Sequence, residues 1–219
     1  MRSVIFDLDG TLADTSGDLL AAANACFEGL GLGRLLDAGD AGTALRGGKA
    51  MLALGFSRVE GHGAEAVEAE YPKLLRHYAA ALDHHTVLYP GALEAVERLR
   101  AEGFSVAICT NKPEGLAEAL MTSLGVRDRF GALVGADTLP VRKPDPAPFF
   151  EAVARVGGDP KRALLVGDSM TDERTARAAG VPSVSVSFSP DAESRAEMSP
   201  DAWLDDYAAL PALAARLLP

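Results

Sequence analysis

Short apolar runs rich in β-branched residues alternate with longer stretches of helical periodicity along most of this chain. Strands are predicted at Ser3–Asp7, Ser105–Thr110, Ala132–Val134, Ala163–Val166 and Ser183–Ser187. Helices are predicted between and after them, at Ala92–Ala101, Glu114–Ser123, Ala147–Val156, Thr171–Ala179 and Tyr207–Leu217. Strands that alternate with helices indicate βαβ units and a parallel sheet. The predicted fold class is therefore α/β, with a Rossmann-like parallel sheet at its core.

The segment between the first two strands breaks this alternation, because its periodicity is helical throughout. One helix is expected to begin near Ser16, and two more are expected at Ala41–Leu54 and Ala64–Leu82. Pro72 lies inside the last of these patterns and is expected to kink or split it. We therefore predict an inserted α-helical cap domain at residues 15–86 and an α/β core at residues 1–14 and 87–219.

Composition indicates which partners the protein is expected to bind and in which cell compartment it is expected to lie. The formal net charge of −10 argues against nucleic acid and anionic membranes as partners. The two cysteines, Cys26 and Cys109, fit no disulfide or zinc pattern, and Cys109 is expected to be a small buried hydrophobe. No apolar stretch is long enough to cross a bilayer, and a strand almost directly after Met1 leaves no room for a signal peptide. A cytoplasmic location is expected.

Asp7 and Asp9 directly follow the first apolar run, in the string D-L-D-G-T-L. Side chains two residues apart on a strand point to the same side. Two like charges there are costly unless a cation lies between them or one carboxyl holds a proton. Gly10 then lets the backbone turn sharply or approach a ligand. The string suggests a metal-assisted carboxylate nucleophile with an acid/base partner, whereas a strand end with solvated acids is the alternative.

Three further polar clusters follow predicted strands, at the sheet edge where open α/β folds bind ligands. Thr110 and Asn111 precede a helix and form either a phosphate-sized anion cradle or a helix cap. Lys143 lies in the rigid string R-K-P-D-P and would bring a fixed ammonium to the carboxylates. Asp168 and Asp172 complete an oxygen-rich site for a hard cation such as Mg²⁺, although Asp172 also suits a helix N-terminus.

These clusters, in this order, resemble the haloacid dehalogenase-like superfamily. The resemblance covers roughly residues 1–13 and 86–190, and the helical block resembles the mobile cap of that family. Within it, the chain is similar to phosphoglycolate phosphatases, through the strings Tyr89-Pro90-Gly91, Thr110-Asn111-Lys112-Pro113, Gly135-Ala136-Asp137-Thr138-Leu139-Pro140, Lys143-Pro144-Asp145-Pro146 and Gly167-Asp168-Ser169 with Asp172.

The resemblance implies a catalytic role for each matched residue. Asp7 would attack phosphorus and become an aspartyl-phosphate. Asp9 would protonate the leaving alcohol and then deprotonate the hydrolytic water. Thr110 and the Asn111 amide would hold phosphoryl oxygens, and Lys143 would pair with both the phosphate and Asp7.

The resemblance also implies a metal site and a helical cap that contributes to specificity. Asp168 would ligate Mg²⁺ together with Asp7 and the Asp9 main-chain carbonyl, and Asp172 would order the outer metal shell. In the cap, Arg46 and Lys49 flank two glycines and form either an anion contact for a substrate carboxylate or a helix start with solvated bases.

Some positions depart from the family pattern or match no partner in it. Glu173 stands where the family usually has an apolar residue, and it is expected to add a surface charge. The run Val184–Pro190 lacks the tyrosine/glycine turn of phosphoglycolate phosphatases. The histidines, which we expect at the surface or an interface, are His62, His77, His84 and His85.

The predicted function is Mg²⁺-dependent hydrolysis of a small phosphorylated metabolite, 2-phosphoglycolate first, by a monomer or homodimer. A phosphosugar mutase or a sugar-phosphate phosphatase on the same scaffold is one alternative. A phospho-accepting signalling receiver is an alternative of another class, because receivers also place an aspartate, a hydroxyl and a lysine around Mg²⁺. The position of the candidate nucleophile after the first strand, and the inserted cap, count against a receiver.

Overall fold

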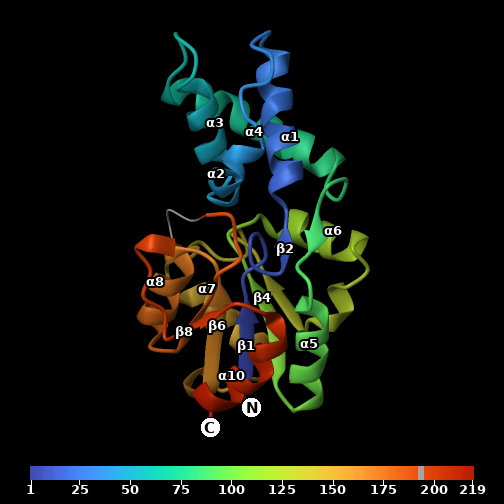
Figure 1. Cartoon of the computed structure of the whole chain (residues 1–219), viewed down its shortest axis with the longest axis vertical. Coiled ribbons are helices and arrows are strands. Elements are labelled where there is room, and N and C mark those ends of the chain that lie inside the picture. The colour runs from blue at the N-terminus through green and yellow to red at the C-terminus, as the bar shows by residue number, and fades with distance from the viewer. Residues whose placement is uncertain (192–194) are drawn as a thin grey trace. The chain divides into compact units, whose positions relative to one another are not determined.

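The computed structural model describes residues 1–191 and 195–219, which form two compact units (Figure 1). The core unit comprises Met1–Ala13 and Leu88–Pro219, and the helical unit comprises Asp14–Val87. These limits lie one residue from the domain limits predicted from the sequence. In the described residues, no helix is long and apolar enough to cross a membrane.

A six-stranded parallel sheet forms the centre of the core unit, which confirms the predicted α/β class. Its strand order is β5-β4-β1-β6-β7-β8. The strands are β1 (Ser3–Phe6), β4 (Ser105–Cys109), β5 (Ala132–Val134), β6 (Ala163–Gly167), β7 (Ser183–Val186) and β8 (Ala202–Leu204). Because β1 lies between β4 and β6, the carboxyl ends of these three strands are neighbours (Figure 1).

Five helices of the core unit follow the predicted order. They are α5 (Ala92–Ala101), α6 (Glu114–Ser123), α7 (Ala147–Arg155), α8 (Met170–Ala179) and α10 (Leu210–Leu217). The last begins three residues later than predicted, because Tyr207–Ala209 forms a 3₁₀ turn in which the Asp206 side chain caps the Ala208 amide.

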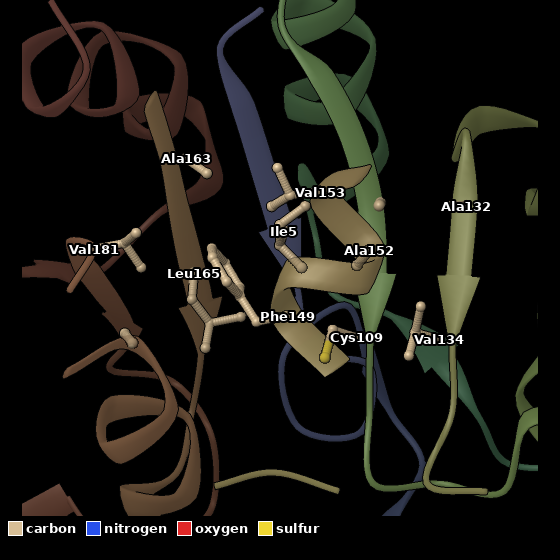
Figure 2. Close-up of a cluster of buried hydrophobic side chains, with 12 residues drawn as sticks. Ile5, Cys109, Ala132, Val134, Phe149, Ala152, Val153, Ala163, Leu165 and Val181 are labelled. Atoms are coloured by element: carbon tan, nitrogen blue, oxygen red, sulfur yellow. The ribbon is translucent and has the colours of Figure 1, made fainter. Parts of the chain in front are cut away.

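Helix α7 packs against the centre of the sheet through Phe149, Ala152 and Val153 (Figure 2). Facing side chains include Ile5 from β1 and Leu165 from β6. All five are almost completely buried, so this cluster ties the two strands that carry the candidate aspartates to one helix. Cys109, at the end of β4, belongs to the same cluster, as the sequence predicted.

We expect both thiols to resist modification while the protein is folded. Burial raises the pKa of Cys109 to about 12, and burial with nearby Glu70 raises the pKa of Cys26 to about 11. A thiol in the unfolded chain has a pKa of about 8.5, so it ionises at lower pH than the buried thiols do. The protonated thiols therefore contribute their full stability below about pH 8.5, and this stability is lost as the pH rises toward the folded-state pKa values. At pH 8, Ellman's reagent should label neither thiol in native buffer and both in guanidinium. Rapid labelling of the native protein would contradict this burial.

The helical unit contains α1 (Ser16–Gly29), α2 (Ala41–Leu45), α3 (Gly48–Phe56) and α4 (Ala64–Ala80). The single helix predicted at Ala41–Leu54 is wrong, because Gly47 has φ 103° and interrupts it. The predicted split of the last helix is also wrong. Helix α4 runs through Pro72, with Val67, Leu74 and Tyr78 buried along its length.

The chain passes between the units through two short strands that the sequence did not predict. These are β2 (Ala13–Asp14) and β3 (Val87–Leu88), which pair as a separate two-stranded sheet. Within the helical unit, the buried Asp18 carboxylate accepts hydrogen bonds from the backbone amides of His85 and Thr86. The first and last segments of the helical unit are thereby held together.

Candidate active site

Asp7 and Asp9 lie on a tight turn that begins where β1 ends. The Asp7 amide donates to the Val166 carbonyl at 2.8 Å, so Asp7 continues the pairing of β1 with β6. Gly10 then adopts φ 81°, and the Leu8 carbonyl accepts from the amides of the three residues after Gly10. The glycine allows this reversal because it has no Cβ. The turn holds the two carboxylates at the end of the central strand.

Lys143 lies buried between two of the candidate carboxylates. Its Nζ is 2.9 Å from Asp7 Oδ1 and 2.6 Å from Asp172 Oδ1. Burial alone would lower the pKa of Lys143, but the two carboxylates outweigh burial and raise it, so the side chain is an ammonium. The Asn111 side-chain amide donates to the Lys143 carbonyl at 3.0 Å and fixes the loop that carries it. The structure thus brings Asp7, Lys143, Asp172 and Asn111 together.

Both carboxylate oxygens of Asp168 accept a hydrogen bond from a hydroxyl group. Thr11 Oγ1 lies 3.1 Å from Oδ1, and Ser189 Oγ lies 2.7 Å from Oδ2. Tyr207 anchors this arrangement, because its hydroxyl donates to the Thr11 carbonyl at 2.7 Å. The sequence prediction missed all three of these supporting residues. Only Thr11 had a local signal, as part of the D-L-D-G-T-L string.

Asp172 caps the start of α8 and also faces the buried Lys143 ammonium. Its Oδ2 accepts from the Ser169 amide, and the Ser169 hydroxyl accepts from the Asp172 amide in return, which forms a capping box at the start of α8. Its Oδ1 faces Lys143 at the same time. Gly167 makes room for this side chain, since a Cβ there would lie 2.4 Å from Asp172 Cβ. The helix cap therefore fixes Asp172 within the candidate site.

Asp7, Asp168 and Asp172 form a buried group of carboxylates that fits a hard cation. One oxygen from each lies within 4.8 Å of the others. Burial raises the pKa of Asp7 to about 6 despite Lys143, and burial with the neighbouring carboxylates raises that of Asp168. Asp7 Oδ1 is buried, and besides its ion pair with Lys143 it accepts no hydrogen bond from the residues that the structure describes. A donor set made only of oxygens suits a divalent cation such as Mg²⁺ or Ca²⁺.

The loop after β4 brings a further lysine to the site. The Thr110 amide donates to the Val134 carbonyl, and Thr110 Oγ1 accepts from the Lys112 amide at 3.2 Å. The Lys112 ammonium lies 2.9 Å from Asp9 Oδ1. The sequence prediction gave Lys112 no role, because its pairing with Asp9 spans 103 residues.

Comparison with known proteins decides the family. Residues 1–180 match the model of the haloacid dehalogenase-like hydrolases. Two phosphoglycolate phosphatases are close in sequence. The one from Agrobacterium fabrum is 37% identical over 216 residues, which cover 98% of this chain and 93% of the relative. The one from Rhodospirillum rubrum is 40% identical over 214 residues, which cover 95% of this chain and 89% of the relative. The chain belongs to the haloacid dehalogenase-like hydrolase family.

A solved structure agrees with this membership. It is described as a predicted phosphoglycolate phosphatase from Haemophilus somnus, and it superposes with a TM-score of 0.83 at 27% identity. The superposition covers 97% of each chain. The fold of this hydrolase is therefore shared over nearly its whole length, including the helical unit.

Glu173, which departs from the usual pattern of these hydrolases, is buried and has a structural role. Glu173 was expected to add a surface charge, but its side chain is only 3% exposed. It accepts from the Ser199 amide at 2.7 Å and pairs with Arg177, so it ties α8 to the segment before β8. The prediction was wrong because the backbone partner lies 26 residues away and leaves no local pattern.

The residues predicted to bind substrate from the cap lie in the helical unit. Arg46 directly follows α2 as its C-cap residue, and Lys49 lies in the first turn of α3. Lys49 Nζ is 2.6 Å from Glu68 and 5.2 Å from the centre of the Tyr71 ring. Their contact with a substrate stays a prediction.

Of the histidines, His77, His84 and His85 are exposed, and His62 stacks on Phe56.

Proposed function

We propose that this hydrolase cleaves small phosphomonoesters with Mg²⁺, through an aspartyl-phosphate on Asp7. The observation that carries the proposal is the buried Asp7 carboxylate, 2.9 Å from the Lys143 ammonium and beside Asp168. An attacking carboxylate needs nearby positive charge before it can approach a phosphate dianion. Lys143 supplies one such charge in a protein whose net charge is −10.

The reaction consists of two displacements at phosphorus. In the first, an Asp7 oxygen forms a bond to phosphorus, the ester P–O bond breaks, and Asp9 gives its proton to the departing alkoxide. In the second, Asp9 takes a proton from water, the water oxygen bonds to phosphorus, and the bond to Asp7 breaks. Splitting the hydrolysis in this way replaces one difficult step by two easier ones. Thr110, Asn111 and Lys143 hold the phosphoryl oxygens.

Asp7 and Asp168, with the Asp9 main-chain carbonyl, would hold Mg²⁺, and Asp172 would order its outer shell. The ion supplies charge neutralisation and orientation of the phosphoryl group. Thr11 and Ser189 fix the Asp168 carboxylate, and such outer contacts orient metal ligands. The helical unit acts as a cap that excludes bulk water, with Arg46 and Lys49 contacting the substrate carboxylate.

The first substrate to test is 2-phosphoglycolate, because both relatives described above are named phosphoglycolate phosphatases. Phosphate release from 2-phosphoglycolate, sugar phosphates and other small phosphoesters, with Mg²⁺ or with chelator, tests the proposal. We expect Mg²⁺-dependent turnover that is fastest on a small phosphorylated acid. Conversion of glucose 1-phosphate without phosphate release would favour a mutase. A stable phosphoprotein without turnover would favour a receiver.

Mg²⁺ should also stabilise the folded protein, because the metal relieves repulsion among the buried carboxylates. At about 100 times the dissociation constant, a ligand that binds only the folded state adds about 2.7 kcal/mol. For a chain of this size, each kcal/mol of added stability raises Tm by about 2–4 °C, so we expect a rise of about 5–10 °C in Tm. Thermal melts with and without Mg²⁺ measure it, and Asp168→Asn should lose most of the shift. An equal shift in that variant would place the ion elsewhere.

A further inference from the structure

Lys112 is a buried lysine to which the proposed reaction gives no role. Its side chain is only 3% exposed, and its Nζ lies 2.9 Å and 3.3 Å from the two oxygens of Asp9. Lysine is rarely buried unless its charge is paired. The pair therefore places a fixed ammonium on the carboxylate that the proposed reaction uses as acid and base.

The backbone around Lys112 holds this ammonium in place. The Lys112 amide donates to Thr110 Oγ1, and its carbonyl accepts from the Ala136 amide at 2.9 Å. Strands β1 and β4 are paired directly before these residues, with Phe6 opposite Ile108. The loop that carries Lys112 and the turn that carries Asp9 thus leave adjacent strands, each fixed by its own hydrogen bonds.

Each of the two aspartates after β1 has its own buried lysine. Lys143 pairs with Asp7, and Lys112 pairs with Asp9. Two carboxylates two residues apart repel each other, and the Asp9 side chain is 16% exposed, so water is available to it. The Lys112 ammonium, within 2.9 Å and 3.3 Å of the two Asp9 oxygens, opposes rotation of this carboxylate toward solvent. We propose that Lys112 is a positioning residue that holds the Asp9 carboxylate where it meets the leaving group.

This inference rests on the proposed function and makes a prediction that depends on the leaving group. A departing alkoxide needs a proton from Asp9, whereas p-nitrophenolate departs readily without one. A well-placed general acid contributes about 10²–10⁴-fold. Lys112→Met should therefore lower kcat/KM for an alkyl phosphate by about tenfold or more beyond any loss on p-nitrophenyl phosphate. A purely structural defect would lower both values alike.

The experiment measures kcat/KM on both substrates for the wild type, Lys112→Met, Asp9→Asn and the double variant. Lys161→Met is the matched control, because Lys161 is exposed in the 3₁₀ turn Pro160–Arg162 before β6. Circular dichroism checks each fold. Lys112→Gln, which keeps one donor for Asp9, is the second variant and should lie between the wild type and Lys112→Met. In the double variant, the loss of Lys112 should add no further selectivity between leaving groups.

The outcomes separate this inference from the proposed function. A selective loss on the alkyl substrate in both single variants, without addition in the double variant, supports the positioning role. If Asp9→Asn shows the selective loss but Lys112→Met and Lys112→Gln affect both substrates equally, the positioning role is overturned. The proposed function stays intact in that case. The absence of any selective loss in Asp9→Asn would remove the acid role of Asp9 and the inference together.

Discussion

Asp7→Asn should abolish phosphate release, with a loss in kcat on the order of 10⁴-fold or more, as expected when a covalent nucleophile is removed. An amide oxygen is a poor nucleophile toward phosphorus, and the amide also removes one negative charge from the pair with Lys143. The change is nearly isosteric, so the buried cluster around residue 7 should keep its packing. Single-turnover and steady-state phosphate release measure the effect.

Asp128→Asn makes the same chemical change at a side chain that is 79% exposed, and it serves as the matched control. It should retain the wild-type rate. A rate for Asp7→Asn within tenfold of the control would exclude Asp7 as the nucleophile. A Tm close to that of the wild type would show that the loss is chemical rather than structural.

Lys143→Met should affect both stability and catalysis. The side chain is 2% exposed and pairs with Asp7 and Asp172, which would be left as buried carboxylates without their cation. Removing one member of a buried ion pair typically costs about 3–5 kcal/mol of unfolding free energy. Losing one electrostatic contact to the transferring group typically costs about 10²–10³-fold in kcat.

Denaturant titration and steady-state kinetics separate these two effects of Lys143→Met. Saturating Mg²⁺ should restore part of the stability, because it brings positive charge back to the carboxylates, but it should not restore kcat. Lys161→Met removes an exposed lysine and should change neither quantity. Wild-type kcat in Lys143→Met would mean that the ammonium only balances buried charge.

The sheet could be predicted from the sequence because its central strands are continuous apolar runs, buried on both faces. β8 was missed although the equally short edge strand β5 was predicted, because all of β5 is buried whereas Trp203 in β8 is 41% exposed. The break at Gly47 was missed because helical periodicity continues across it. Whether a glycine ends a helix depends on the packing around it, which the pattern does not contain.

The candidate site was predictable where its residues follow strands directly, as Asp7, Asp168 and Thr110 do. The parallel sheet brings strand ends to one edge, so local motifs were enough to place them together. The contacts of Lys112 with Asp9 and of Ser189 with Asp168 join residues 103 and 21 positions apart, without a local signal. Such supporting contacts arise from tertiary structure alone.

The most direct test of this account is to trap the intermediate. The wild-type protein, mixed with Mg²⁺ and ³²P-labelled substrate and quenched in acid during turnover, should carry acid-stable label that hydroxylamine removes. Borohydride reduction should convert the labelled aspartate to homoserine, and peptide mass spectrometry should find it at position 7. Label on another residue, or turnover without any labelled protein under single-turnover conditions, would contradict the account.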